Sequence, residues 1–360
     1  MRSTDSLPAL GWTEAFARAF VPFVEKGLSP ARVAVEHRSL YVLYAELGDV
    51  HATLAGRLRH EAQRAGERPA VGDWVAASIP EHDDAPAVIR AVLPRASAFS
   101  RKVPLGPTEE QVVAANVDVV FLIAALRDEP NLRRLERYLA LAWESGAQPV
   151  IVLSKADLEP AGAASEEQVR AIAPGVPVHR ISAITGEGLE AVRAYLRPGQ
   201  TVALLGPSGV GKSTLVNALL GAGRQLVAEV RDDGKGRHTT THRELILVPG
   251  GGLLLDTPGM RELQLWEGET GLGEAFDDVA ELAAACQFRD CAHAGEPGCA
   301  VEEAIRAGAL SADRLRSYHK LHAELRHFEA RYDRAARQAE VQRSRSGSKA
   351  LRAHLKNKYR

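Results

Sequence analysis

The chain has 360 residues, of which 45% are hydrophobic, and its formal net charge is −1. Its length predicts about two or three domains with a sizeable core, and the total charge singles out no class of partner. No apolar run reaches the roughly 18 residues of a membrane span, the first residues lack the layout of a signal peptide, and three cysteines are too few for a disulfide framework. We therefore expect a cytoplasmic protein.

The first 29 residues hold four aromatic side chains at the spacing of one helical face: Trp12, Phe16, Phe20 and Phe23. This spacing predicts a short helix whose aromatic face packs on a neighbouring part of the chain. The segment carries no motif from which a further role follows.

Five short apolar or alternating runs follow, over residues 32–36, 40–46, 50–58, 73–79 and 88–93. Runs of this length and spacing predict a small β-barrel, with an OB-fold as the leading candidate. Barrels of this kind often bind nucleic acid on one face, and five side chains could serve that purpose: Arg57, Arg59, Arg68, Tyr41 and Tyr44. A structural barrel with a solvated basic edge is the open alternative.

Residues 94–116 contain prolines, a glycine and basic side chains, a composition that predicts a linker. After it, buried-strand patterns alternate with amphipathic helix patterns. We expect strands over residues 117–126, 149–153, 176–181, 201–205, 244–248 and 252–255, and helices over 132–144, 166–173, 189–196 and 215–220. This alternation predicts a mostly parallel sheet with helices on both faces.

A phosphate-binding loop joins the expected strand over 201–205 to the helix that follows. Residues 206–214 read GPSGVGKST, which fits the pattern G-x-x-x-x-G-K-[ST]. The glycines let the backbone wrap around phosphate, while the loop N–H groups and the helix N-terminus supply positive potential. We expect Lys212 to reach the outer phosphates and the Ser213 hydroxyl to ligate Mg²⁺.

Two later segments fit the same site. The sequence DTPG begins at Asp256, which can hold the Mg²⁺ shell through water, and the N–H of Gly259 can contact the terminal phosphate. The preceding loop over residues 232–242 reads DDGKGRHTTTH, a composition suited to a segment that bound γ-phosphate and Mg²⁺ bring into order. We choose Thr240 as the second hydroxyl ligand of Mg²⁺, with Thr239 as the alternate.

The upstream sequence SKAD, over residues 154–157, resembles the N-K-x-D motif that selects guanine. The carboxylate of Asp157 would accept hydrogen bonds from N1–H and the 2-amino group of guanine, a pair that adenine lacks, and the stem of Lys155 would pack over the base. Ser154 stands where asparagine is expected, which puts in question the usual tie between this motif and the phosphate loop. Two residues downstream match the short S-A motif that backs the base: Ser182 and Ala183.

The order of these motifs is unusual. In ordinary GTPases the phosphate loop comes first and the guanine motifs last, whereas here both guanine motifs precede the phosphate loop. This order predicts a circularly permuted GTPase, because opening the chain elsewhere leaves the contacts of a parallel sheet unchanged. The permutation also puts a new domain directly after DTPG.

All three cysteines lie close together with one histidine, in the spacing C-x₄-C-x-H-x₅-C: Cys286, Cys291, His293 and Cys299. Three thiolates and one imidazole complete a tetrahedral Zn²⁺ site with no open position, so the expected role is structural. Metal binding in such a short segment can supply much of the folding free energy, about 10–16 kcal/mol in isolated finger peptides. Three inert core cysteines beside an unrelated histidine are the alternative.

The end of the chain is basic. Apolar residues recur every three or four positions over residues 315–332 and predict a long helix. Residues 312–360 carry a net charge of +9, which leaves −10 for the rest of the chain, and the last 20 residues hold seven Lys or Arg and no acid. We expect a flexible basic arm that contacts RNA, with a merely solvated tail as the alternative.

A small barrel, a permuted GTPase and a Cys₃His segment in this order resemble the ribosome small-subunit-dependent GTPase A family. The most specific pieces are GRHTTTH, DTPG followed by MREL, and CQFRDCAHAGEPGCAVEEAI. The resemblance implies a bacterial assembly factor of the 30S subunit that binds 16S rRNA, hydrolyses GTP slowly until the subunit stimulates it, and is released on hydrolysis. Met260 stands where many GTPases place the glutamine that orients the attacking water, and our hypothesis for that role is His238.

We therefore predict a multidomain α/β protein: residues 1–94 with the RNA-binding barrel, 95–265 with the permuted GTPase, and 266–360 with the zinc-binding helices and basic tail. The predicted catalytic residues are Lys212, Thr240 and His238, and the predicted Mg²⁺ ligands are Ser213 and Thr240. The predicted GTP contacts are Ser154, Lys155, Ala156, Asp157, Ser182, Ala183, Gly206, Pro207, Ser208, Gly209, Val210, Gly211, Lys212, Ser213, Thr214, Asp256 and Gly259.

We expect a monomer that binds GTP or GDP, the 30S subunit and 16S rRNA. One alternative is a guanine-nucleotide switch that acts on another RNA or ribonucleoprotein, with or without turnover. A less favoured alternative is a P-loop ATPase or small-molecule kinase, and nucleotide selectivity separates it from the GTPase interpretation.

Overall fold

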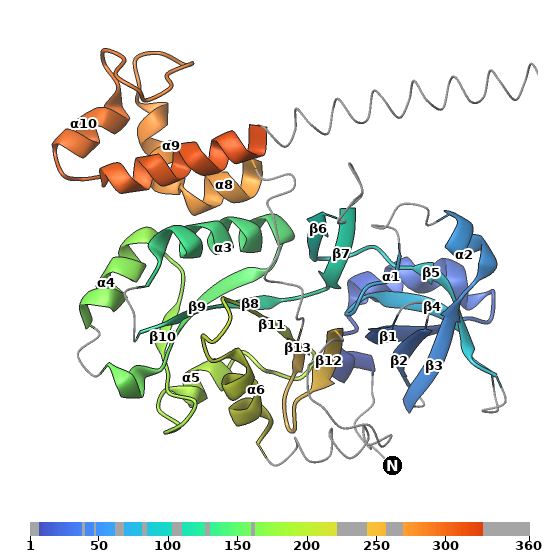
Figure 1. The fold of residues 1–360 in the computed structure, drawn as a ribbon. Coiled ribbons are helices and arrows are strands. Elements are labelled where there is room, and N and C mark those ends of the chain that lie inside the picture. The colour runs from blue at the N-terminus through green and yellow to red at the C-terminus, as the bar shows by residue number, and fades with distance from the viewer. Residues whose placement is uncertain are drawn as a thin grey trace, which may run out of the picture.

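The computed structural model describes residues 7–37, 40–46, 48–61, 68–80, 85–102, 110–126, 130–159, 163–221, 243–256 and 269–326. The chain forms a barrel, a central sheet with helices on both faces, and a helical group that lies over helix α3 (Figure 1). No helix in these described stretches is both long enough and apolar enough to cross a membrane.

Five strands close into the predicted barrel in the order β1-β2-β3-β5-β4, with β4 paired back to β1. They are β1 (Ser29–His37), β2 (Leu40–Ala45), β3 (Gly48–Leu54), β4 (Trp74–Ser78) and β5 (Ala87–Val92). The interior is filled by alternate residues of the strands, including Ala31, Val33, Leu43, Val75 and Ile89. The third strand ends at Leu54, earlier than the predicted residue 58, because the residues that follow form helix α2 (Gly56–Glu61).

The N-terminal segment packs on the barrel, as its aromatic spacing predicts. It consists of the 3₁₀ helix η1 (Leu7–Leu10) and helix α1 (Glu14–Val24). The ring centroids of Trp12 and Trp74 are 4.7 Å apart in an edge-on arrangement, and Phe16 and Phe20 are buried beside them. The backbone N–H of Gly199 donates to the carbonyl of Ala9, so the segment also contacts the central domain.

The segment predicted as a linker contains a β-hairpin, and that prediction is wrong. Strands β6 (Ala98–Lys102) and β7 (Glu110–Ala115) pair antiparallel. Phe99 and Val113 are buried and give the hairpin an apolar face that its proline and glycine content concealed. Two of the prolines and the glycine belong to residues 103–109, outside the described part of the chain.

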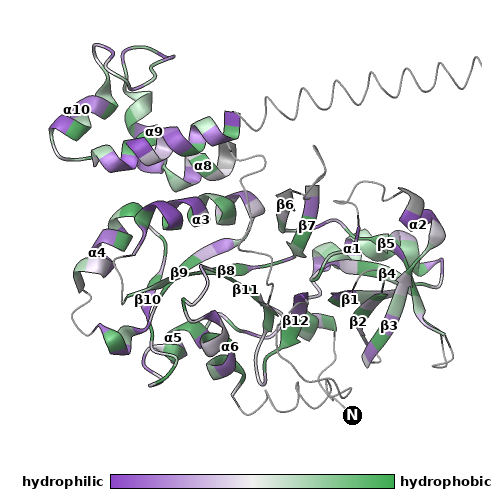
Figure 2. Cartoon of the chain, viewed as in Figure 1, coloured by the Kyte–Doolittle hydropathy of each residue, from purple (hydrophilic) through white to green (hydrophobic). Residues whose placement is uncertain are grey.

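The central sheet has the order β10-β9-β8-β11-β13-β12 and is parallel except for β12, which confirms the predicted α/β arrangement. Its strands are β8 (Val119–Ala125), β9 (Gln148–Ser154), β10 (Val178–Arg180), β11 (Thr201–Leu205), β12 (Arg243–Leu247) and β13 (Leu253–Asp256). Helices α3 (Leu132–Ser145) and α4 (Ala163–Ile172) cover one face, and α5 (Leu189–Arg193) and α6 (Lys212–Leu220) cover the other. The strands inside the sheet are largely hydrophobic, whereas the helices carry both hydrophilic and hydrophobic residues (Figure 2).

The barrel and the central sheet form one continuous structure, because β12 pairs with both β13 and β1. The buried guanidinium of Arg32 strengthens this junction by donating to the carbonyl oxygens of Gly72, at 3.1 Å, of Asn116, at 2.9 Å, and of Leu10. Burial lowers the pKa of Arg32 to about 10, so the side chain stays charged at neutral pH. One side chain thus ties together the N-terminal segment, the barrel and the start of the central domain.

The C-terminal helices lie on α3 and are fixed there by a buried ionic cluster. They are α8 (Glu269–Ala275), α9 (Asp277–Ala284), α10 (Ala300–Arg306) and a helix over residues 312–326. The Arg314 guanidinium donates to the carboxylates of Glu136 and Asp278, at 2.9 Å each, and lies over the ring of Phe276. A Cβ at Gly271 would lie 2.4 Å from a backbone oxygen of α3, so only glycine permits this close approach of the helices.

Candidate functional site

The phosphate loop follows the fully buried strand β11 and ends at the first turn of α6. Gly209 and Gly211 have φ values of 75° and 105°, which glycine adopts without strain, and Gly211 is the N-cap of α6. The ammonium group of Lys212 donates to the carbonyls of Gly206 and Pro207, each at 2.6 Å. The lysine is therefore held against the loop in which it is expected to meet phosphate.

The N-terminal turn of α6 presents Ser213 and Thr214, both exposed, beside Lys212. An ammonium group, exposed hydroxyls and the unpaired N–H groups of a helix N-terminus form an arrangement that binds anions and a hydrated cation. The predicted Ser208 is likewise exposed, whereas Val210 is buried beneath the loop.

The tie between the guanine motif and the phosphate loop, which serine put in question, is present. The buried hydroxyl oxygen of Ser154 lies 2.6 Å from the carbonyl oxygen of Val210 and 3.2 Å from that of Ala124. A hydroxyl has one proton to donate, and the shorter contact identifies Val210 as its acceptor. Lys155 adds a second link, because its ammonium group donates to the carbonyl of Gly209 at 2.9 Å.

The remaining guanine residues meet the phosphate loop at one edge of the sheet. Asp157 is in the 3₁₀ helix η3 (Ala156–Leu158), whose first N–H donates to the carbonyl of Ile181, the residue directly after β10. The buried hydroxyl of Ser182 accepts from the N–H groups of Ile184 and Thr185 and shapes the loop that contains Ala183. Because β9, β10 and β11 are parallel, their carboxyl ends bring these loops together at the place where open α/β sheets bind ligands.

The other predicted nucleotide residues are only partly placed. Asp256 is the last residue of β13, and its backbone lies opposite Glu244 of β12. Apart from Lys212, the predicted catalytic residues and the switch residues lie outside the described residues: His238, Thr239, Thr240, Gly259 and Met260.

The chain order of these placed loops is itself informative. Along the sequence, the Ser154 and Ser182 loops precede the phosphate loop and Asp256, yet in space they surround one site at one sheet edge.

The model of the RsgA GTPase family matches residues 92–266. Over 94% of its length the chain is 48% identical to a protein of Opitutus terrae named Small ribosomal subunit biogenesis GTPase RsgA, of which it covers 95%. The chain belongs to the RsgA GTPase family.

Further RsgA proteins support this membership. A protein of the same name from Streptomyces coelicolor is 46% identical over 94% of this chain and 92% of that protein. The crystal structure of YjeQ from Thermotoga maritima covers 83% of this chain and 98% of its own, with 29% identity and a TM-score of 0.63. As an RsgA GTPase, the chain is a GTP-hydrolysing enzyme with a circularly permuted nucleotide-binding domain.

The region after the RsgA family match contains a group of four side chains that could hold a metal ion: Cys286, Cys291, His293 and Cys299. The four potential ligand atoms lie within 4.8 Å of one another. The Nδ1 atom of His293 is 3.6 Å from the sulfur of Cys286 and 3.5 Å from that of Cys299. Around Zn²⁺, with Zn–S about 2.3 Å and Zn–N about 2.0 Å, sulfur and nitrogen are about 3.5 Å apart, so this donor set fits tetrahedral zinc.

The protonation state and the backbone conformation of His293 both favour metal binding. Burial lowers the pKa of His293, which favours the neutral imidazole that binds metals. Its φ of 56° is unusual for a residue other than glycine, and the carboxylate of Glu296 holds the strained loop by accepting from the N–H groups of Ala292, at 3.1 Å, and Ala294, at 2.7 Å. Our sequence reasoning missed Glu296, although its place between His293 and Cys299 could have indicated a role in shaping the loop.

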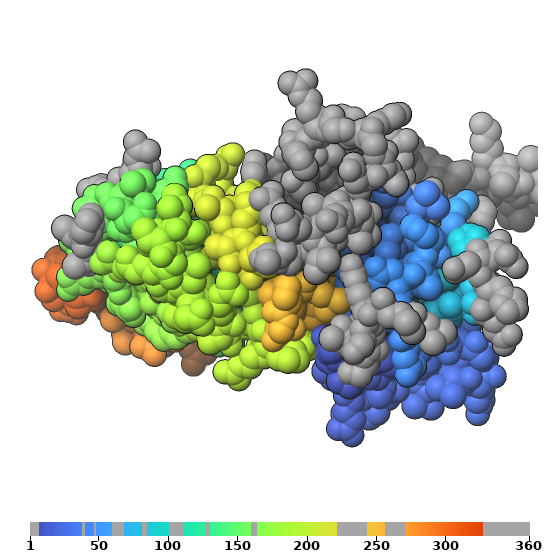
Figure 3. All heavy atoms as spheres, turned by 90° about the horizontal axis from the view of Figure 1, so that it is seen from below, coloured from blue at the N-terminus to red at the C-terminus, as the bar shows by residue number. Residues whose placement is uncertain are grey.

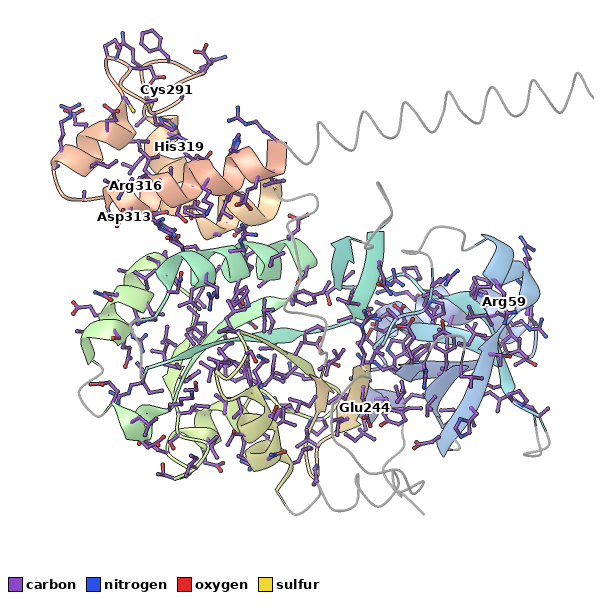
Figure 4. All side chains as sticks on the ribbon, in the orientation of Figure 1. Arg59, Glu244, Cys291, Asp313, Arg316 and His319 are labelled. Atoms are coloured by element: carbon purple, nitrogen blue, oxygen red, sulfur yellow. The ribbon has the colours of Figure 1, made fainter. Side chains whose placement is uncertain are left out.

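The predicted RNA-binding side chains of the barrel separate into two groups. Arg57, Arg59 and Arg68 are exposed, and Figure 4 shows Arg59 on the outer side of the barrel. Tyr41 and Tyr44 are only 2% and 8% exposed. The prediction that these tyrosines offer stacking surfaces is therefore wrong, because both rings belong to the packed interior.

Proposed function

We propose that the protein is a GTP-hydrolysing assembly factor of the 30S ribosomal subunit, which binds ribosomal RNA and leaves the subunit when GTP is hydrolysed. The observation that carries this proposal is the link between the Ser154 hydroxyl and the phosphate loop, which joins a guanine-reading loop to a phosphate-binding loop. The names of the RsgA relatives supply the context of small-subunit biogenesis.

The nucleotide roles follow from chemistry. Lys212 neutralises the outer phosphates, Ser213 and Thr240 ligate Mg²⁺, and Asp157 reads the guanine edge. The buried Ser182 and the half-buried Ala183 support the base from behind. Asp256 and Gly259 respond to the terminal phosphate, with Asp256 acting through the water shell of Mg²⁺.

His238 is our candidate for orienting the attacking water, since Met260 cannot do so. His238→Ala is expected to lower the rate of GTP hydrolysis at least tenfold and to leave GDP affinity unchanged, because general base or orienting groups contribute about 10²–10⁴-fold. A His238→Ala protein with an unchanged rate in the presence of 30S subunits would remove this residue from the mechanism.

The parts outside the nucleotide site bind RNA and metal in this proposal. Residues 1–94 form the barrel domain, 95–265 the GTPase domain and 266–360 the zinc domain with its basic tail. The exposed arginines of the barrel and the basic tail contact 16S rRNA, and one structural Zn²⁺ is bound by the Cys₃His cluster. The protein acts in the cytoplasm as a monomer.

Sedimentation with ribosomal subunits tests the proposal. The protein with a non-hydrolysable GTP analogue is expected to co-sediment with 30S subunits, whereas the GDP-bound protein is not, because hydrolysis would end the contact. Isolated 50S subunits are the control. Equal co-sedimentation with GDP and the analogue, or equal binding to 50S, would contradict the assembly-factor function and favour a switch with another partner.

A further inference from the structure

Strand β12 joins the two parts of the molecule that the proposed function must connect. It pairs with β13 of the GTPase sheet on one side and with β1 of the barrel on the other. Three residues stand in one row across these strands: Val35 opposite Glu244, and Glu244 opposite Asp256. Since neighbouring strands are about 4.8 Å apart, the backbone of the barrel lies roughly 10 Å from the start of DTPG.

The same strand is the direct continuation of the loop that holds the candidate catalytic residues. Thr240 precedes Arg243, the first residue of β12, by three positions. Both segments expected to respond to the γ-phosphate therefore adjoin strands that lie beside the barrel.

Side chains of the barrel reinforce this backbone pairing. The hydroxyl of Tyr44, on β2, donates to the carbonyl oxygen of Leu245 at 2.9 Å, and the tyrosine is buried. The guanidinium of Arg243 is 3.4 Å from the carboxylate of Glu36 on β1, and both side chains are less than a fifth exposed. Figure 4 shows Glu244 at this junction, and in the view from below the gold surface of this region lies between the barrel and the α5–α6 side (Figure 3).

We propose that the barrel anchors the GTPase switch through β12, and that Tyr44 and Glu36 are positioning residues for GTP hydrolysis. The anchor holds Arg243 and Leu245 of β12, which directly follow the loop over residues 232–242 in the sequence. A force on the barrel, such as its engagement with RNA, then acts on the first residues of β12 without any direct contact with GTP. This inference rests on the proposed function for the identity of the partner, but the anchoring itself concerns GTP hydrolysis alone.

The Tyr44→Phe variant tests the anchor, because it removes the hydroxyl and keeps the buried ring. The matched control is Tyr41→Phe on the same strand, whose ring lies in the barrel interior away from β12. We expect Tyr44→Phe to lower kcat roughly three- to tenfold, the factor that one net hydrogen bond represents. The Kd for GDP should stay within about twofold of the wild-type value, and hydrogen exchange of the β12 amides should become faster. Glu36→Gln, which keeps the size of the side chain, should lower kcat in the same direction.

Two results would overturn the anchor. One is a kcat of Tyr44→Phe and Glu36→Gln equal to that of Tyr41→Phe, both alone and with 30S subunits. The other is a parallel loss of kcat and GDP affinity, which would indicate general damage to the nucleotide site. The wild-type protein tests the proposed function separately. If 30S subunits do not raise its rate of GTP hydrolysis, the proposed function is wrong. The kcat values of the variants without 30S subunits still test the anchor in that case.

Discussion

At the scale of single residues, the Ser154 hydroxyl performs the task expected of an asparagine side chain. Ser154→Ala would leave the buried carbonyl of Val210 without this donor, at a cost of about 1–3 kcal/mol. We expect the Kd for mant-GDP to rise roughly tenfold, measured by fluorescence titration. Ser78→Ala, on a barrel strand, is the matched loss of a hydroxyl and should leave the Kd unchanged; an equal Kd in both variants would refute the role of Ser154.

Glu296 has a comparable role in the metal loop. The hydrogen bond from the Ala294 N–H, with others from the backbone, lowers the pKa of Glu296, so the side chain accepts as a carboxylate. Glu296→Gln is expected to weaken zinc binding at least tenfold, as outer-shell changes do at other metal sites. Competition with a zinc-binding dye measures this affinity, and Glu303→Gln, on the exposed side of α10, is the control. An unchanged zinc affinity of Glu296→Gln would exclude the role.

At the scale of elements, the buried cluster around Arg314 holds the C-terminal helices on α3. Arg314→Met leaves Glu136, which is 3% exposed, as an uncompensated buried charge, and we expect the free energy of unfolding to fall by about 3–5 kcal/mol in urea titrations. Arg316→Ala is the control, because its ion pair with Asp313, labelled in Figure 4, is exposed and contributes about 0–1 kcal/mol. Equal losses in the two variants would contradict the proposed importance of the interface.

Elements with strong periodicity could be predicted from the sequence, and those defined by distant contacts could not. Strand β11 has the predicted bounds, because its apolar run is buried on both faces. The β6–β7 hairpin escaped prediction, since its prolines and glycine obscured two short strands whose burial depends on the rest of the fold. The burial of Tyr41 and Tyr44 was equally hidden, because the closed barrel encloses Tyr41 and the packing of β12 on the barrel covers Tyr44.

The candidate site divides in the same way. The phosphate loop and the Cys₃His cluster could be predicted, because their chemistry depends on residues close in the sequence. The hydrogen bond from Ser154 to Val210 joins residues 56 positions apart, and the pairing of β12 with β1 joins segments over 200 positions apart. No local pattern reports such contacts.

At the scale of the whole molecule, the metal cluster and the nucleotide site belong to separate parts. Removal of the metal with a chelator is expected to speed hydrogen exchange over residues 286–306, since the segment depends on metal for much of its stability. The amides of β8, β9 and β11 should keep their protection, and the Kd for GDP should stay the same. Loss of nucleotide binding on chelation would contradict this independence.

The central proposal is that this member of the RsgA GTPase family hydrolyses GTP on the small ribosomal subunit, and one rate measurement tests it most directly. GTP hydrolysis by the purified protein should be slow alone and rise at least tenfold with 30S subunits, with no such rise when 50S subunits are added. A rate that 30S subunits leave unchanged, or that both subunits raise equally, would contradict the account.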